Sequence, residues 1–387
     1  MRIVFISNFL NHHQTPFCEA MKARVEEFHF IATVATPEKF LAFGYEEANE
    51  KYDYVVRSYE SQQAWEKAKR LCLECDVLIA GTAPEEFLIP RLKAGKATFR
   101  YSERLYKKKP SLWDLPHDMI SAWLHMGRYQ KYPFYMLSAS AYTALDTARF
   151  GNFRNRCYKW GYFPPVRQHN INALMEQKRH EIPRLLWAGR FVDWKHPDDV
   201  IELARRLKKD GYKFRLDLIG AGPMEQQLEE MIRQWELSDC VYLPGSMKQE
   251  EVRSHMEAAN LYFFTSDRNE GWGAVLNESM NSGCAVIASH MIGSVPFLVK
   301  NGENGMIYRS GDVDMLYEKA KYLLDHPQQQ ERLGKNACRT MVELWNAETA
   351  AERLVQLIEN ILAGKVTPFA EGPCSTASIL REDWFEA

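Results

Sequence analysis

The stretch from Thr265 to Ser289, together with the apolar run 261–265 that leads into it, constrains the fold of this chain more than any other. An apolar run is followed by a polar loop that contains Glu270-Gly271-Trp272-Gly273, and a second apolar run closes the stretch. The residues between them predict a short amphipathic helix over about 274–282, which stops at Gly283 because glycine is a common helix terminator. Strand, loop, helix and strand in this order are typical of a parallel α/β sheet, in which ligands bind at the carboxyl ends of the strands.

The loop suits a phosphorylated ligand. Gly271 and Gly273 allow the backbone to approach a ligand closely. The N–H groups of Ala274 and Val275 open the predicted helix, where backbone amides bind phosphate.

Two glutamates border the same loop. Glu278 lies one turn inside the predicted helix, so its side chain leans back toward the loop. A carboxylate would repel a phosphate, so we expect Glu278 to accept hydrogen bonds from sugar hydroxyls, and Glu270 to do the same for a second sugar. This spacing indicates a nucleotide-sugar site. The alternative is two surface acids near a helix start, where acids are common.

Composition limits the class of protein. A chain of 387 residues suits two domains, and 46% hydrophobic with 26% charged residues is an ordinary globular mixture. A net charge of −2 argues against nucleic-acid binding. We find no apolar run of about 18 residues and no long apolar region near the N-terminus, so we expect a cytoplasmic protein without a membrane span or signal peptide.

Apolar segments alternate with helical patterns along both halves of the chain, which predicts two doubly wound α/β domains. A proline-rich and then polar stretch places the boundary near 166–182. We therefore expect an N-terminal domain over 1–166 and a C-terminal domain over 183–363. The tail, 365–387, either rejoins the first domain or is disordered.

The second half begins with a predicted strand, 184–188, followed by Gly189, Arg190 and Lys195. Two cations in one loop at the end of a strand could clamp a diphosphate, the arginine in bidentate fashion and the lysine as a point charge. The alternative is that both are solvated surface cations.

Neither a metal nor a dinucleotide is expected. The lone pair Cys72 and Cys75 has no further ligands at zinc spacing. Gly220-Ala221-Gly222 begins like a dinucleotide fingerprint, but Glu225 stands where the third glycine belongs.

Two segments of the first half have open interpretations. His12 and His13 follow the first predicted strand and either contact an acceptor or cap a helix. Residues 104–132 are basic and aromatic with helical spacing. They form either a membrane-surface patch or an amphipathic helix packed on the sheet, and the second interpretation is favoured because such helices mostly face the core.

The motif Glu270, seven residues, Glu278, followed by Met280 and the run from Gly283 to Ser289, resembles the signature of retaining GT-B glycosyltransferases of family four. The Gly-Arg…Lys element that ends at Lys195 resembles a second motif of that family. The resemblance covers residues 184–362. It implies two Rossmann-like domains that face each other across a cleft.

The resemblance also implies roles. Arg190 and Lys195 would bind the donor diphosphate, Glu270 the donor sugar and Glu278 the ribose. Arg190, Lys195 and Glu270 are the candidate catalytic residues. No metal or other cofactor is needed, because the two cations take the place of a metal ion. The implied donor site comprises Gly189, Met247, Gly271, Trp272, Gly273, Ala274, Val275 and Glu278.

The N-terminal half departs from the family. The family often has a histidine where this chain has Ser102, Glu103 and Arg104. Residues 8–11 of this chain stand where the family has a pair of glycines. His12, His13, Glu103 and Arg104 are therefore the candidate acceptor-side residues.

The expected function is transfer of a sugar from a nucleoside-diphosphate sugar, UDP-linked by preference, to a hydroxyl of a glycan or lipid-linked acceptor in surface polysaccharide assembly. Contact with the inner face of a membrane would suit such an acceptor. The alternatives are a GT-B-type sugar-nucleotide epimerase and a non-catalytic nucleotide-sugar-binding subunit.

Overall fold

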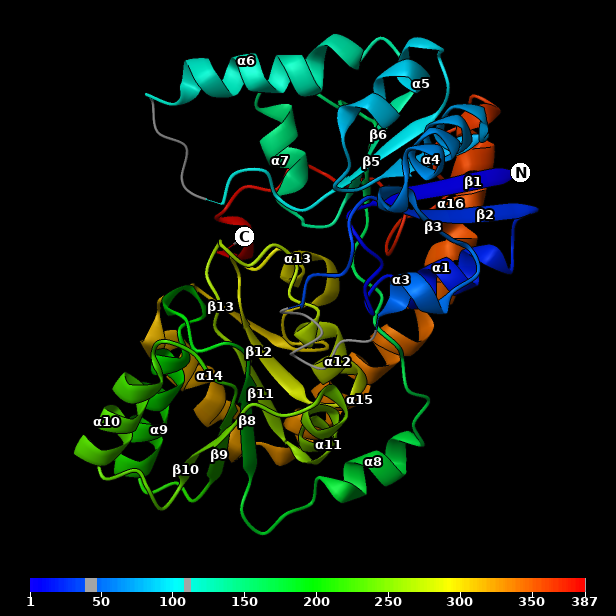
Figure 1. The fold of residues 1–387 in the computed structure, drawn as a ribbon. Coiled ribbons are helices and arrows are strands. Elements are labelled where there is room, and N and C mark those ends of the chain that lie inside the picture. The colour runs from blue at the N-terminus through cyan, green and yellow to red at the C-terminus, as the bar shows by residue number, and fades with distance from the viewer. Residues whose placement is uncertain (39–46, 108–112, 387) are drawn as a thin grey trace. The chain divides into compact units, whose positions relative to one another are not determined.

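The computed structural model describes residues 1–38, 47–107 and 113–386 (Figure 1). The chain forms two compact units. Unit 1 comprises Met1–Pro165 and Trp345–Arg381, and unit 2 comprises Val166–Leu344 and the residues from Glu382 onward. Each unit has its own parallel sheet, which confirms the predicted α/β fold class.

Unit 1 is built on a seven-stranded parallel sheet in the order β3-β2-β1-β4-β5-β6-β7. The inner strands are almost wholly buried, as expected when helices cover both faces of a parallel sheet. The strands are β1 (Arg2–Ser7), β2 (Glu27–Ala32), β3 (Val55–Arg57), β4 (Val77–Ala80), β5 (Thr98–Ser102), β6 (Phe134–Ser138) and β7 (Cys157–Lys159). The helices are α1 (Thr15–Lys22), α3 (Ala48–Lys51), α4 (Gln62–Glu74), α5 (Ile89–Lys93), α6 (Leu115–His125), α7 (Thr143–Ala148) and α16 (Ala347–Leu362), with 3₁₀ turns η1 (Ser58–Glu60), η2 (Glu85–Phe87) and η3 (Gly127–Tyr129).

Unit 2 is built on a six-stranded parallel sheet in the order β10-β9-β8-β11-β12-β13. Its strands are β8 (Arg184–Ala188), β9 (Arg215–Ile219), β10 (Val241–Gly245), β11 (Leu261–Phe264), β12 (Ala285–Ser289) and β13 (Met306–Tyr308). Its helices are α8 (Ile171–Gln177), α9 (Pro197–Lys209), α10 (Glu225–Gln234), α11 (Gln249–Ala258), α12 (Val275–Asn281), α13 (Val295–Leu298), α14 (Val313–Asp325) and α15 (Pro327–Glu343), with 3₁₀ turns η4 (Asp193–Lys195) and η5 (Trp384–Glu386).

Helices cover both faces of the unit 2 sheet. Helices α9, α10 and α14 pack together on one face, and α11, α12 and α15 pack together on the other (Figure 1). Fully buried side chains such as Leu216, Phe263 and Ile287 fill the core between sheet and helices. The predicted strand–loop–helix–strand unit is confirmed as β11, α12 and β12.

The division into units differs from the predicted domains at α16. The sequence pattern places this helix in the C-terminal domain, but it belongs to unit 1, where its apolar face packs against α1. Leu354 and Leu357 are fully buried there, and Arg24 forms an ion pair of 2.6 Å with Glu348. The tail then pairs with the edge of the same sheet, where Lys159 donates its backbone N–H to Ser375 over 2.7 Å.

Two short elements of unit 2 were not predicted. Helix α8 occupies the stretch that we read as a linker; the side chain of Asn170 caps it, and Leu174 and Met175 are buried. Strand β13 contributes only three residues, too few for a clear apolar pattern. Among the described helices, none combines the length and the apolar character that crossing a membrane requires.

The favoured interpretation of residues 104–132, a helix whose apolar face packs on the sheet, is wrong for α6. Ala122 is buried, but Met119, Ile120 and Trp123 are exposed. These three residues share one face of the helix, and that face is exposed. Lys108 and Lys109, also part of this prediction, lie outside the described residues.

Candidate functional site

The order of strands in unit 2 brings two predicted loops together. Strands β8 and β11 are direct neighbours, although β9 and β10 lie between them in the sequence. After β8 the chain adds β9 and β10 on one side, and after β11 it adds β12 and β13 on the other side, so the strand order reverses between β8 and β11. Ligands of open α/β sheets bind at such a switch point, beyond the carboxyl ends of the strands.

Lys195 and Glu270 meet at this switch point. The Lys195 ammonium lies 2.5 Å from a carboxylate oxygen of Glu270, and the Ser266 hydroxyl donates to the same oxygen over 2.9 Å. Both side chains of the pair are mostly buried, with 13% and 12% exposed. The backbone carbonyl of Lys195 accepts a hydrogen bond of 2.6 Å from Thr265, which fastens the β8 loop to the end of β11.

The two predicted cations share one aromatic ring. The Lys195 ammonium lies 4.8 Å from the centre of the Trp194 ring, and the guanidinium carbon of Arg190 lies 5.8 Å from it. Arg190 is exposed, so its donors face solvent. Cation–π attraction thus holds both charges beside the same indole. The sequence prediction did not include Trp194, although an aromatic residue between two cations is a usable signal.

Two glycines are closely packed in this site. Gly273 has φ +82°, and a side chain there would come within 2.3 Å of the Phe264 ring. A side chain on Gly189 would meet Trp187 at 3.1 Å and the Lys195 stem at 3.4 Å. These glycines let the Glu270 loop and the Lys195 side chain lie against the ends of their strands.

Glu278 is buried at the start of α12, with 8% of its surface exposed. It accepts a hydrogen bond of 2.7 Å from the side-chain amide of Gln249. Burial raises the pKa of Glu278, while the hydrogen bond from Gln249 and the charge of Arg253 act in the opposite direction. Met247 lies two residues before Gln249, so the β10 loop and Glu278 border the same region. Gln249 carried no signal in the sequence.

The remaining loop residues are largely buried. Trp272 is fully buried, and its indole N–H donates to Asn277 over 2.9 Å, so its ring faces the core. Gly271 and Ala274 are buried, whereas Val275 is partly exposed. The N–H of Leu276 makes a helical hydrogen bond of 3.0 Å to Gly273.

Gly220 and Gly222 have a packing role that explains the incomplete dinucleotide pattern. A side chain at Gly220 would lie 1.8 Å from the carbonyl oxygen of Gly189, and one at Gly222 would lie 2.4 Å from that of Phe191. Backbone hydrogen bonds join the same segments, including Phe191 to Ala221 over 3.0 Å. The glycines therefore allow the β9 loop to support the loop that carries Arg190.

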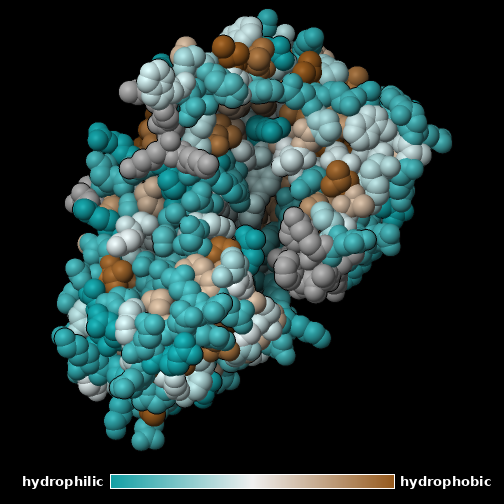
Figure 2. All heavy atoms as spheres, turned by 60° about the vertical axis from the view of Figure 1, so that its left-hand side comes forward, coloured by the Kyte–Doolittle hydropathy of each residue, from teal (hydrophilic) through white to brown (hydrophobic). Residues whose placement is uncertain are grey.

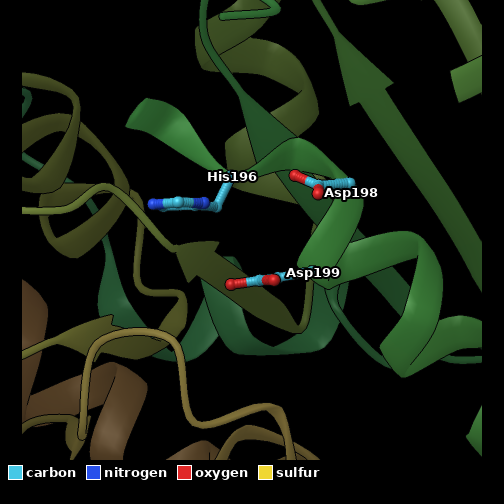
Figure 3. A group of neighbouring side chains, drawn as sticks. All are labelled: His196, Asp198 and Asp199. Carbon is cyan, nitrogen blue, oxygen red and sulfur yellow. The ribbon is translucent and has the colours of Figure 1, made fainter. Parts of the chain in front are cut away.

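Within the described residues, His196, Asp198 and Asp199 form the group that could hold a cation. One ligand atom from each lies within 4.8 Å of the others, and both carboxylates extend from the start of α9 toward the side where the imidazole lies (Figure 3). Burial raises the pKa of Asp199 to about 6. Acids in a first helical turn are also favoured by the helix dipole, so the cluster has a structural explanation. Metal independence remains a prediction.

Three of the candidate acceptor-side residues lie in one cluster of unit 1. The His12 and His13 ring centres are 3.6 Å apart, and His13 stacks on Tyr162 at 5.6 Å. The Tyr162 hydroxyl donates to Glu103 over 2.6 Å. Burial lowers the pKa of His12 to about 4 and that of His13 well below its usual value, so both imidazoles are neutral near pH 7. Tyr162 was missed because it stands in a segment that we read as strand and linker.

Arg104, the fourth acceptor-side candidate, does not join this cluster. Only 1% of its side chain is exposed. Its guanidinium lies 4.7 Å from the Tyr142 ring centre, and its Nε lies 4.0 Å from Asp146 of α7. This buried pair joins the β5 loop to α7.

A small cavity of about 200 Å³ lies at the amino ends of β8 and β9, beside the end of α11. Its polar groups pair with one another, since Asp217 lies 3.0 Å from Arg215 and 3.7 Å from His255. We therefore place the candidate site at the switch point rather than in this cavity.

A known family matches the part of the chain that contains this candidate site. Residues 173–340 match the family model described as "Glycosyl transferases group 1". Residues 173–340 are a group 1 glycosyl transferase domain. The group 1 domain contains every predicted donor-site residue, from Gly189 to Glu278.

Two curated relatives match the group 1 domain and its surroundings. The amylovoran biosynthesis glycosyltransferase AmsK of Erwinia amylovora is 30% identical over 156 residues, which cover 39% of this chain and 38% of AmsK. The putative colanic acid biosynthesis glycosyltransferase WcaL of Salmonella typhimurium is 26% identical over 184 residues, which cover 46% of this chain and 45% of WcaL. The chain spans less than half the length of each.

A solved structure shares the fold over nearly the whole chain. HepE of Anabaena, solved in complex with UDP, matches with a TM-score of 0.68 and 14% identity, covering 93% of this chain and all of HepE. This likeness shows the fold of the whole chain, of which the group 1 domain is one part. Together with the two parallel sheets, it identifies the fold as GT-B.

Proposed function

We propose that this protein is a retaining glycosyltransferase that moves a sugar from a nucleoside-diphosphate sugar, UDP-linked by preference, to a hydroxyl of a glycan or lipid-linked acceptor. The observation that carries the proposal is the meeting of Lys195 and Glu270 at the switch point of unit 2, beside Arg190. The polysaccharide roles in the names of AmsK and WcaL and the UDP bound to HepE support the substrate class.

In the proposed reaction, the acceptor hydroxyl oxygen forms a bond to the anomeric carbon while the bond from that carbon to the diphosphate oxygen breaks, and the hydroxyl proton passes to the departing diphosphate. The attack comes from the side of the leaving group, so the configuration is retained. Arg190 and Lys195 stabilise the negative charge that develops on the departing diphosphate, as fixed charges in a water-poor site do well. Glu270 orients the donor sugar, and Glu278 binds the ribose hydroxyls.

The same residues supply a reason to propose a metal-independent reaction. Two cations lie beside one indole at the place where the diphosphate would bind, so charge neutralisation does not need a divalent ion. His196, Asp198 and Asp199 form the group where a cation could still act. Chelation should therefore leave transfer unchanged, whereas activity that requires added Mg²⁺ or Mn²⁺ would oppose the proposal.

The acceptor side is proposed for unit 1, where His13, Tyr162 and Glu103 lie together. Neutral imidazoles, a phenol and a carboxylate can hydrogen-bond sugar hydroxyls without attracting the donor phosphates. The proposed location is cytoplasmic, at the inner face of a membrane where lipid-linked acceptors are accessible.

Product analysis tests this function against the alternatives. The protein is incubated with a labelled UDP-sugar, with and without glycan and lipid-linked acceptors. The proposal expects a new glycoside whose anomeric configuration matches that of the donor. An epimerised nucleotide sugar formed without acceptor would support the epimerase instead. Binding with neither transfer nor donor hydrolysis across the acceptor panel would support a non-catalytic subunit.

A further inference from the structure

Helix α6 of unit 1 presents an apolar surface to solvent. Met119, Ile120 and Trp123 are 57%, 61% and 59% exposed, and Trp113 just before the helix is 92% exposed. Positions 119, 120 and 123 share one helical face, because residues three and four apart are neighbours on a helix. Apolar residues gather at the top of Figure 2, at the height at which Figure 1 draws α6.

This concentration is unusual for the chain. Among the described residues, thirteen large apolar side chains are exposed, and four of them lie within the eleven positions 113–123. Single exposed apolar residues are ordinary, but a contiguous exposed group marks an interaction surface. The underside of α6 is fixed, since Ala122 is buried and His125 hydrogen-bonds Glu85 of η2. The exposed face therefore keeps its outward direction.

Cations flank this apolar face. Between Tyr106 and Tyr132 the sequence has five lysines and arginines against two aspartates, whereas the whole chain has a net charge of −2. Lys107, Arg128 and Lys131 are exposed in the structure. Tryptophan and exposed aliphatic residues surrounded by cations are the chemistry of a helix that lies in the headgroup region of an anionic bilayer.

We propose that α6 attaches the protein to an anionic lipid surface, with Met119, Ile120 and Trp123 entering the interface and the flanking cations binding headgroup phosphates. The helix has eleven residues and is about 16 Å long, so it lies in the interface and does not cross the bilayer. Symmetric pairing with a second copy is disfavoured, because an isologous contact would bring the two sets of cations together.

The attachment adds a partner to the proposed function, since it gives access to a lipid-linked acceptor, but it can be tested without the donor site. The full chain is co-sedimented with phosphatidylcholine vesicles that contain or lack phosphatidylglycerol. We expect binding to the anionic vesicles that weakens with salt. The triple variant Met119→Gln/Ile120→Gln/Trp123→Gln should bind them about tenfold more weakly or worse, because it loses the inserted side chains.

A matched control is available in the same unit. Leu362, Val366 and Ile379 are 63%, 86% and 60% exposed, so Leu362→Gln/Val366→Gln/Ile379→Gln removes similar apolar groups away from α6. This control should bind vesicles like the wild type. Charge reversal at Arg128 and Lys131 should abolish the preference for anionic vesicles.

Three results would overturn the proposal. The first is equal vesicle binding by the wild type and the α6 triple variant. The second is failure of the wild type to bind anionic vesicles at low salt. The third is that neither protein binds vesicles, while the wild type forms concentration-dependent dimers that the triple variant does not form. UDP binding is measured on the same triple variant. Unchanged UDP binding with lost vesicle binding assigns the defect to α6, whereas absence of UDP binding in the wild type would contradict the donor assignment alone.

Discussion

The Lys195 ammonium is held from several directions. It bonds Glu270, lies 4.8 Å from the Trp194 ring centre and lies 5.9 Å from that of Phe264. A charge fixed in this way before the reaction costs little reorganisation when the leaving group becomes negative. Its position follows from the sheet order, since Lys195 follows β8 and Glu270 follows the neighbouring strand.

Replacement of Lys195 by Ala should lower transfer by about 10²-fold or more, because one of the two cations that face the leaving group is lost. Steady-state transfer rates with labelled donor measure the effect. Lys209→Ala, which removes an exposed lysine from the end of α9, is the control and should be near normal. Lys195→Ala leaves the Glu270 carboxylate without its cation. Lys195→Ala/Glu270→Gln removes that unpaired charge, so it checks that a folding defect is not responsible for the loss of transfer. Near-normal turnover in Lys195→Ala would remove the diphosphate-clamp assignment.

Asp199 should destabilise unit 2 at alkaline pH. Burial raises its folded pKa to about 6, above the ordinary aspartate value, so the folded state binds a proton more tightly than the unfolded state. The favourable contribution of the Asp199 carboxyl to the free energy of unfolding is fully present at low pH and is lost as pH rises through about 6. Asp199→Asn should therefore raise the free energy of unfolding by about 1–2 kcal/mol at pH 8, after allowance for partial exposure and the lost helix-dipole term.

Urea unfolding at pH 8 and pH 5 checks this effect. The gain from Asp199→Asn should shrink at pH 5, where the wild-type carboxyl is mostly protonated. Asp198→Asn, in the same helical turn, is the comparison, because a gain that depends only on removing a first-turn acid would appear there too. An equal gain at both pH values would contradict the assigned pKa.

The sequence predicted which residue types border the site but not which of them meet. Lys195 and Glu270 are 75 residues apart, and only the order of strands places them side by side. Arg104 is an acceptor-side candidate by its place after a strand, yet its side chain lies in the interior beside Asp146 of another element. Trp272 looked like part of a ligand loop, but Asn277 holds its indole in the core. Such choices depend on tertiary neighbours that local patterns do not contain.

At the scale of elements, helices and strands with strong local patterns were predictable. Helix α12 lies at Val275–Asn281 within the expected 274–282, because Gly283 and two apolar runs delimit it. The position of α16 was not predictable. Its sequence shows an amphipathic helix, but only the complementary surface of α1 determines the sheet on which it packs.

Replacement of Leu354 by Ala should destabilise unit 1 by about 2–5 kcal/mol, because it removes a fully buried side chain of α16. Hydrogen exchange measured by mass spectrometry should show lost protection in α1 and β1. Leu316→Ala in α14, also fully buried, is the matched control and should affect unit 2 instead. Lost protection in α15 and β12 with α1 unchanged after Leu354→Ala would contradict the assignment of α16 to unit 1.

At the scale of the whole molecule, two sheets of similar design have different chemistry at their strand ends. Unit 2 brings together cations, glycines and a buried glutamate, which suit a nucleoside diphosphate linked to a sugar. Unit 1 brings together neutral histidines, a tyrosine and a glutamate, which suit hydroxyl groups. The sequence indicated the first site through two motifs, but the second only through candidate residues, because the N-terminal half departs from the family pattern.

Calorimetric binding of UDP, GDP and ADP to the wild type and to Glu278→Ala tests the central claim most directly. We predict that UDP binds in preference to the other two and that Glu278→Ala weakens its binding by about tenfold or more, because a buried acceptor for the ribose hydroxyls is lost. Glu229→Ala, an exposed change in α10, should have no effect. Equal UDP binding by the wild type and a folded Glu278→Ala variant, or no nucleotide binding by the wild type, would contradict the donor site proposed for unit 2.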